Sequence, residues 1–225
     1  MIKPTKPARE NISPSDLTFG LSTCKRCLWI KYWFKVTMPG AFPLVGTMAA
    51  LQEEHFQGAD MPTIDPSLRA GKVTKWGEWV KSKPLVINGA ETRWRILGKY
   101  DLVATNEDGT IGLIDCKVSD SQRDSGQFYS PQLEAYAYSL ENPAAGKSQS
   151  VASIGLLVWK PTTAIGTTVD DYGFGVFQKY VPVERDQANF LKVIGEFIDV
   201  LEGELPDSGP DCQTCNYLVA RNALD

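Results

Sequence analysis

Two Cys-x-x-Cys pairs, one toward each end of the chain, constrain the fold more than any other feature of the sequence. Cys24 and Cys27 form the first pair, Cys212 and Cys215 form the second, and 184 residues separate the pairs. Two such pairs are typical of a tetrahedral thiolate site that holds zinc or an iron–sulfur cluster. A zinc ribbon encloses far fewer residues, so this site is expected to join the two ends of a folded domain.

The compartment decides whether these cysteines bind metal or form disulfides. Met1–Glu10 contains Lys, Pro and Arg without an apolar stretch, so no secretory signal is expected. The longest nearly continuous apolar run, Val151–Trp159, is too short to cross a bilayer. We therefore predict a cytoplasmic protein with no membrane partner, in which disulfides are rare. Metal binding is then favoured over the alternative of four unrelated thiols.

Composition and charge exclude several classes of protein. The 225 residues are 43% apolar and 22% charged, which fits one globular domain over residues 1–225 and excludes collagen, coiled coil and disorder. The net charge of −4 is uneven. Residues 1–100 carry 15 basic and 8 acidic side chains, and residues 101–225 carry 8 and 19. A basic half can attract phosphate, but charge alone does not decide the function.

Hydrophobic periodicity and turn residues predict an alternation of helices and strands. Helices are expected over residues 17–32, 46–56, 127–140 and 184–201. Strands are expected over residues 80–86, 94–105, 111–118, 151–159 and 172–183. Residues 58–72 are expected to form a connector. This order predicts an α/β (α+β) fold in which helices flank a mixed central β-sheet.

Two carboxylates and a lysine lie on the strands of one predicted hairpin. Asp115 and Lys117 are two residues apart, so their side chains share a face. A two-residue loop would turn Asp101 to the opposite face, whereas the three-residue loop Glu107–Gly109 pairs Asp101 with Asp115. We predict the three-residue loop, or a bulge near its glycine. Two adjacent carboxylates favour a divalent cation, and the lysine can orient water or stabilise charge on a phosphoryl oxygen.

A second pattern follows on the next helix. Gln132 and Tyr136 are four residues apart and therefore share a helical face. Taken alone, a D-x-K triplet is usually a solvated charge pair, and a tyrosine at this spacing is usually part of the packing. The order of the patterns along the chain is more informative than any of them alone.

This order resembles the PD-(D/E)xK nuclease superfamily, in particular its RecB-like branch. That branch has G-x-x-D, then D-x-K after a hairpin, then Q-x-x-x-Y on the following helix. Here the patterns are Gly98–Asp101, Asp115–Lys117 and Gln132–Tyr136, which together span about 40 residues. The resemblance implies a restriction-endonuclease-like core and a deoxyribonuclease that depends on Mg²⁺ or Mn²⁺.

The resemblance also assigns roles to individual residues. It implies catalytic roles for Asp101, Asp115, Lys117, Gln132 and Tyr136. The two aspartates and the backbone carbonyl of Cys116 would hold the metal, and Lys117 would position the attacking water. Gln132 and Tyr136 would support the site and contact DNA. The side chain of Cys116 is expected to face the sheet interior as a small core residue.

The early helix departs from the pattern of the family. Members often have G-x-x-x-H followed by a glutamate, but Ala50 stands at the histidine position counted from Gly46. Glu54 fits the glutamate position, so we expect it to be an additional metal ligand. His55 is the only histidine of the chain. We expect it to be a surface side chain.

The cysteine pattern resembles a subset of the same branch, which includes AddB and CRISPR-associated relatives. Those nucleases carry a four-cysteine iron–sulfur site, with one cysteine before the nuclease core and three after it. In this chain the last of the three is absent, and Cys27 would replace it. The resemblance implies a 4Fe-4S cluster held by Cys24, Cys27, Cys212 and Cys215, and the departure leaves Zn²⁺ as the alternative.

The most favoured function is exonuclease-type cleavage of DNA, at single strands or duplex ends, in repair, recombination or replication. A basic helix adds possible DNA-binding cations, which are Lys25, Arg26, Lys31 and Lys35. The aromatic residues between them, Trp29, Tyr32 and Trp33, would either stack on bases or belong to the core. The alternatives are a noncatalytic nucleic-acid-binding module with a structural metal site and a protein-interaction subunit of a repair or replication complex.

Overall fold

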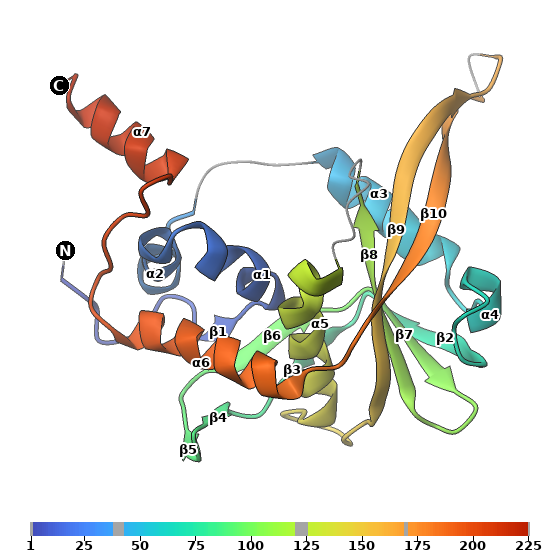
Figure 1. The fold of residues 1–225 in the computed structure, drawn as a ribbon, viewed down its shortest axis with the longest axis horizontal. Coiled ribbons are helices and arrows are strands. Elements are labelled where there is room, and N and C mark those ends of the chain that lie inside the picture. Colours follow the sequence, from blue (N-terminus) through green and yellow to red (C-terminus); the bar gives the residue numbers. More distant parts are fainter. Residues whose placement is uncertain (1, 38–42, 120–125, 169–170, 225) are drawn as a thin grey trace.

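The computed structural model describes residues 2–37, 43–119, 126–168 and 171–224. Its helices are α1 (Pro14–Thr23), α2 (Lys25–Phe34), α3 (Pro43–His55), α4 (Met61–Ile64), α5 (Gly126–Glu141), α6 (Gln187–Glu202) and α7 (Gln213–Asn222). Its strands are β1 (Asn11–Ile12), β2 (Gly71–Trp76), β3 (Trp79–Lys81), β4 (Val86–Ile87), β5 (Ala90–Glu91), β6 (Arg95–Lys99), β7 (Leu102–Asn106), β8 (Ile111–Val118), β9 (Val151–Ile165) and β10 (Gly173–Val183). Figure 1 shows the main sheet on one side of α5 and the helices α1, α2, α6 and α7 on the other.

The main sheet has five strands in the order β10-β9-β8-β7-β2. Strands β8 and β9 are parallel, and the other neighbours are antiparallel. Two parallel neighbours need a crossover connection, and α5 supplies it. This arrangement confirms the predicted mixed sheet flanked by helices.

Both faces of the main sheet are covered around its central strands β7 and β8. On one face, Leu133 and Tyr136 of α5 belong to a buried cluster with Val103 and Leu113. The residues that pack on the opposite face include Phe56, Met61, Ile64, Leu102, Ile114 and Cys116. Cys116 is 4% exposed, which confirms it as a core residue. The alternation along β7 and β8 therefore points one set of side chains toward α5 and the other toward α3 and α4.

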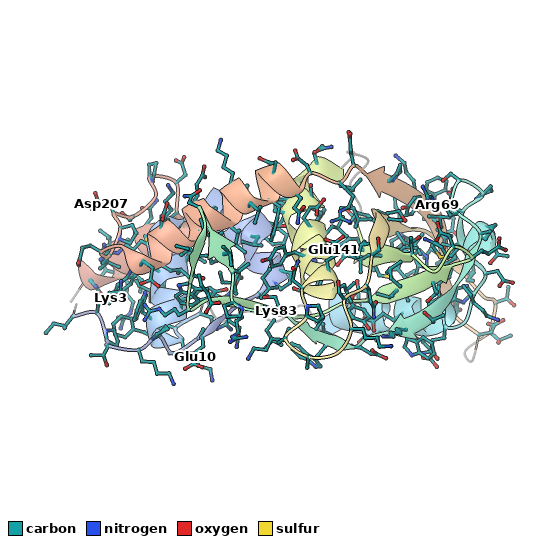
Figure 2. All side chains as sticks on the ribbon, turned by 90° about the horizontal axis from the view of Figure 1, so that it is seen from below. Lys3, Glu10, Arg69, Lys83, Glu141 and Asp207 are labelled. Atoms are coloured by element: carbon teal, nitrogen blue, oxygen red, sulfur yellow. The ribbon has the colours of Figure 1, made fainter. Side chains whose placement is uncertain are left out.

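A third buried cluster lies among the helices beside the sheet. The predicted apolar stripe of α6 is confirmed, and its buried residues are Phe190, Ile194, Phe197, Ile198 and Leu201. Trp94 and Tyr32 pack in the same cluster. In Figure 2, Lys3 and Asp207 lie toward one end of the molecule and Arg69 toward the other. Residues from both ends of the chain thus meet beside α6, since Lys3 also donates to the carbonyl of Glu202 over 2.5 Å.

Several elements differ from the sequence-based expectation. The helix expected over residues 17–32 is interrupted by extended backbone at Cys24, with φ −158° and ψ 111°. The strand expected over residues 94–105 is divided at Tyr100–Asp101, and its halves β6 and β7 join different sheets. Strand β2 was not expected. It begins in the last two residues of the expected connector, and its single buried residue, Val73, leaves no clear apolar alternation in the sequence. Among the described residues, no helix is long and apolar enough to cross a membrane.

Candidate active site and cysteine cluster

The β7–β8 hairpin brings the two aspartates to the same face of the sheet. Leu102 pairs with Ile114, so one step further along the ladder Asp101 lies opposite Asp115. The loop between Asn106 and Thr110 has three residues. Its last residue, Gly109, has a positive φ of 79°. The predicted three-residue loop is therefore confirmed, and with it the shared face of the carboxylates.

Each of these side chains is held by specific contacts. Asp101 Oδ2 accepts a hydrogen bond from the backbone N–H of Cys116 over 2.6 Å. Asp115 is 3% exposed, and its Oδ1 accepts a hydrogen bond from Gln132 Nε2 over 2.9 Å. Its Oδ2 lies 2.5 Å from Lys117 Nζ. The hairpin thus assembles two carboxylates and one ammonium group at one place.

The electrostatics of this group favour an additional positive charge. Burial and the nearby charge of Asp115 raise the pKa of Asp101 to about 8. Burial lowers the pKa of Lys117, but the charge of Asp115 outweighs burial and the pKa is raised overall. Asp115 Oδ2 is buried and, apart from the ion pair with Lys117, accepts no hydrogen bond. An oxygen donor set of this kind fits a divalent cation.

The raised pKa of Asp101 predicts a pH dependence of stability. Without added divalent metal, the folded protein keeps a proton on Asp101 up to about pH 8, whereas the unfolded chain releases it near pH 3.8. The folded state binds more protons between these values, so its free energy of unfolding should fall as the pH rises from about 4 to about 8. The neutral variant Asp101→Asn should lose this part of the slope. Thermal unfolding across this pH range measures it, and identical slopes in both proteins would contradict the assignment.

Gln132 and Tyr136 position the site from inside the protein. They are 4% and 7% exposed. Gln132 orients Asp115 through the bond described above, and the Tyr136 hydroxyl donates to the carbonyl of Lys99 over 2.8 Å. That bond fixes the end of β6 that leads into Asp101. Both side chains are buried and hold the geometry around the two aspartates, so they present little surface for the expected DNA contact, and their catalytic roles stay predictions.

The glycine of the G-x-x-D pattern allows this close packing. A Cβ atom at Gly98 would lie 2.7 Å from two ring carbons of Pro14 and 2.8 Å from Cε1 of Tyr136. Contacts this short require the neighbours to shift. Gly98 is therefore needed because the tyrosine ring and α1 approach the backbone of β6 directly.

The early helix places the neighbour of the expected glutamate closer to the hairpin. Glu54 is exposed, so the structure gives no support to its expected role as a metal ligand, which stays a prediction. Its neighbour Glu53 has a side chain only 15% exposed and lies 3.4 Å from Lys99 Nζ. After burial and Asp115, the charge of Glu53 also raises the pKa of Asp101. Adjacent helical residues point about 100° apart, and this rotation directs Glu53 to the site and Glu54 to solvent. His55 is exposed, as predicted.

The four cysteines converge as predicted. The four sulfur atoms all lie within 4.8 Å of one another. Cys27 Sγ is 3.6 Å from the sulfurs of both Cys212 and Cys215, and Cys24 Sγ is 3.9 Å from that of Cys215. A metal ion fits this set because thiolate sulfurs are the preferred ligands of zinc and iron–sulfur centres.

The two cysteine pairs occupy equivalent positions in two helices. Cys24 is the N-cap of α2 and Cys212 is the N-cap of α7, and the second cysteine of each pair follows three residues later. Helix N-termini stabilise negative charge, and thiolates are the form that binds metal. Burial raises the pKa of Cys24, but hydrogen bonds from backbone N–H groups, led by that of Gly209, outweigh burial and lower it to about 6. The interruption of the first helix at Cys24 thus creates a second helix N-terminus for the cluster.

Comparison with known proteins identifies the family. The family model of the PD-(D/E)XK nuclease superfamily matches residues 45–220, which contain both aspartates, Lys117, Gln132 and Tyr136. The chain belongs to the PD-(D/E)XK nuclease superfamily. The crystal structure of SSO0001 is similar in fold to this PD-(D/E)XK chain, with a TM-score of 0.51 and 14% sequence identity over 97% of this chain and 87% of SSO0001. No curated protein matches the chain at a significant level.

The basic helix of this PD-(D/E)XK chain does not offer aromatic rings for stacking. Trp29, Tyr32 and Trp33 are at most 2% exposed, which confirms the alternative that they belong to the core. Of the four cations, Lys31 pairs with Asp16 over 2.5 Å. Arg26 donates to the carbonyl of Pro206, and Lys25 and Lys35 are exposed. DNA binding by these cations stays a prediction.

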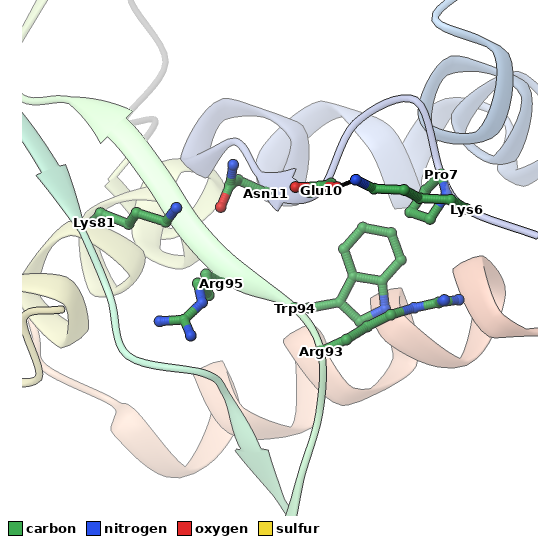
Figure 3. Close-up of a pocket in the computed structure, with 8 residues that line it drawn as sticks. All are labelled: Lys6, Pro7, Glu10, Asn11, Lys81, Arg93, Trp94 and Arg95. Carbon is green, nitrogen blue, oxygen red and sulfur yellow. Dashed lines mark ion pairs between the residues drawn. The ribbon is translucent and has the colours of Figure 1, made fainter.

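A pocket of about 250 Å³ lies between the N-terminal segment and strands β3 and β6 (Figure 3). Its lining residues are Lys6, Pro7, Glu10, Asn11, Lys81, Arg93, Trp94 and Arg95. Glu10 is its single carboxylate, and it forms an ion pair with Lys6. Arg93 pairs with Glu202 over 2.8 Å. With one carboxylate already paired, this pocket lacks the donor set of the hairpin site.

Proposed function

We propose that the chain is a metal-dependent deoxyribonuclease of the RecB-like branch and that it hydrolyses phosphodiester bonds at Asp101, Asp115 and Lys117. The observation that carries this proposal is the hairpin register, which sets Asp101 opposite Asp115 with Lys117 beside them. Membership of a superfamily whose members are generally nucleases supports the same reaction. The G-x-x-D and Q-x-x-x-Y patterns support the branch.

The hairpin aspartates and Glu53 would hold Mg²⁺ or Mn²⁺, with the backbone carbonyl of Cys116 as a further ligand. The bound ion supplies Lewis acidity toward a phosphoryl oxygen and lowers the pKa of a bound water. The three carboxylates do not form a cluster as tight as that of the cysteines. This spread suits an ion such as Mg²⁺, which keeps several waters and takes only one or two carboxylates.

The remaining side chains orient the reactants. The ammonium group of Lys117, fixed by Asp115, can hold the attacking water or stabilise negative charge on the phosphoryl oxygen. Gln132 fixes Oδ1 of Asp115, which leaves Oδ2 directed at Lys117. Tyr136 fixes the backbone that leads into Asp101. These contacts preorganise the site before substrate binds.

For the cysteine cluster we propose a single tetrahedral ion, Zn²⁺, and not the 4Fe-4S cluster that the resemblance implies. Four thiolates about 2.3 Å from one ion lie about 3.8 Å from one another by tetrahedral geometry. The sulfur–sulfur distances of 3.6, 3.6 and 3.9 Å agree with this value. In a 4Fe-4S cluster each thiolate binds a different iron, so the sulfurs would lie farther apart. The ion would join α2 to α7 and stabilise the fold.

The finer assignments follow from the same proposal. An exonuclease acting on single strands or duplex ends in repair, recombination or replication, one domain over residues 1–225 and a cytoplasmic location all stay predictions. The alternative is a noncatalytic nucleic-acid-binding module. The retained set of Asp101, Asp115 and Lys117 favours the enzyme, because a decayed site has no need to keep mutually repelling carboxylates close together.

Labelled single- and double-stranded DNA incubated with the purified protein, with and without Mn²⁺, tests the proposal. We expect degradation only with the ion. Glu53→Gln should raise the Mn²⁺ concentration needed for half-maximal activity about tenfold. The matched control Glu54→Gln should leave it unchanged, because that side chain points to solvent. DNA binding without degradation under any divalent ion would favour the noncatalytic module, and the absence of both would favour a protein-interaction subunit.

A further inference from the structure

Three aromatic rings from two helices form a cluster at the surface. They are Phe19 of α1 and Phe128 and Tyr129 at the start of α5, and we call them the ring cluster. Their ring centroids are 5.1 to 6.0 Å apart, and each pair packs edge to face. Phe19 is 45% exposed and Phe128 is 46% exposed. This exposure contrasts with Trp29, Tyr32 and Trp33 of α2, which are buried.

The ring cluster lies directly beside the proposed catalytic lysine. Lys117 Nζ is 4.9 Å from the ring centroid of Tyr129 and 2.5 Å from Asp115 Oδ2. Tyr129 thus lies next to both the proposed catalytic lysine and the two phenylalanines. A nucleotide chain whose phosphate reaches Lys117 would therefore carry its adjacent bases to the exposed rings.

A cation for the adjoining phosphate lies on the same face of the sheet. Lys117 pairs with Val158 on β9, and Val158 pairs with Lys179 on β10. Paired residues of neighbouring strands point to the same side, so Lys117 and Lys179 share one face of the sheet. Their strands are two positions apart in the sheet, which separates them by about 10 Å. Lys179 is exposed. The surface around the reacting lysine therefore offers both a charge for the backbone and rings for bases, the combination that binds single strands.

We propose that the ring cluster stacks on unpaired nucleobases next to the scissile phosphate and makes single-stranded DNA the preferred substrate. This inference rests on the proposed nuclease function and adds the class of substrate. The faces of bases within a duplex are already covered by their neighbours, so duplex DNA offers the rings only base edges. Exposed phenylalanines gain most from a ligand that presents a flat aromatic face, and an unpaired base does so.

Binding of a fluorescent single-stranded oligonucleotide, measured by anisotropy without divalent metal, tests this inference apart from catalysis. Phe128→Ala and Phe19→Ala should each raise Kd about tenfold. Phe128→Trp should restore binding, since the indole ring also stacks. Tyr217→Ala on α7 is the control, because Tyr217 is 66% exposed and lies in the helix of the second cysteine pair. It should leave Kd unchanged.

Steady-state kinetics give the second readout. Phe128→Ala should raise KM for single-stranded DNA about tenfold with kcat within about twofold, and should leave the cleavage of blunt duplex unchanged. An unchanged Kd in both alanine variants, or an equal loss for single strands and duplex, would overturn the inference. If the wild-type protein cleaves no DNA and the Kd shifts occur, the ring cluster stands and the proposed catalysis fails. If the wild-type protein cleaves DNA normally and the Kd values of the variants are unchanged, the proposed catalysis stands and the ring cluster inference fails.

Discussion

Asp115→Asn and Lys117→Met variants should cleave DNA about a thousandfold more slowly than the wild-type protein, or slower still, while keeping the fold. The asparagine keeps the shape that Gln132 contacts but removes the negative charge proposed to bind metal. The methionine keeps most of the lysine stem but removes the ammonium group 2.5 Å from Asp115. Each change removes several kcal/mol of stabilisation that is present when the phosphodiester bond breaks.

Initial rates on labelled DNA at saturating Mn²⁺ measure this effect, and thermal unfolding shows whether the variants are folded. Asp199→Asn and Lys192→Met are matched controls, since both side chains are exposed on α6. They should cleave at the wild-type rate. Wild-type rates for both hairpin variants would show that the reaction takes place elsewhere on the molecule.

Cys212→Ser should release the metal of the cysteine cluster and lower the melting temperature by about 10 °C or more. A serine hydroxyl is a poor ligand for zinc, and three thiolates leave the tetrahedral shell open. The proposed ion would join residues 185 or more positions apart in the sequence, so its loss would free α7 from α2. Activity should fall as well, as an indirect result of the weaker fold.

Elemental analysis and thermal unfolding of the same samples check this prediction. Wild-type protein purified without oxygen should contain one zinc per chain and be colourless. Ser208→Ala is the control, because this exposed side chain lies in the segment before Cys212. If the wild-type protein is brown and contains iron, the assigned metal centre is an iron–sulfur cluster and not zinc. Wild-type protein with neither metal would end the assignment of a metal centre.

The hairpin site could be predicted from the sequence because its determinants are local. The loop of three residues and the glycine at its end decide the register, and the register decides which face Asp101 takes. The convergence of the cysteines was also predicted, from the chemistry of thiolates in the cytoplasmic compartment expected for this chain, although no local pattern connects Cys27 to Cys212. The loop chemistry limits the possible hairpin registers, and the ligand chemistry of thiolates limits the possible roles of the four cysteines.

Other features depend on contacts that the sequence does not display. The sequence pattern pointed to Glu54, and only the packing of α3 shows that its neighbour Glu53 is the less exposed of the two and lies beside Lys99. The phenylalanines of the ring cluster are distant in sequence, and their association depends on how α1 meets α5. The aromatic residues of α2 were ambiguous for the same reason. The fold buries Trp29, Tyr32 and Trp33 and leaves Phe19 and Phe128 at the surface.

The cysteine cluster also has a consequence for how the protein is made in the cell. Synthesis proceeds from the N-terminus, so Asp101, Asp115 and Lys117 leave the ribosome well before Cys212. A nascent chain can therefore pair β7 with β8 while the two helices that carry the cysteines are still unconnected. Capture of the proposed metal ion would then follow the synthesis of Cys212. A chain stopped before Cys212 would carry the hairpin residues without the link between α2 and α7.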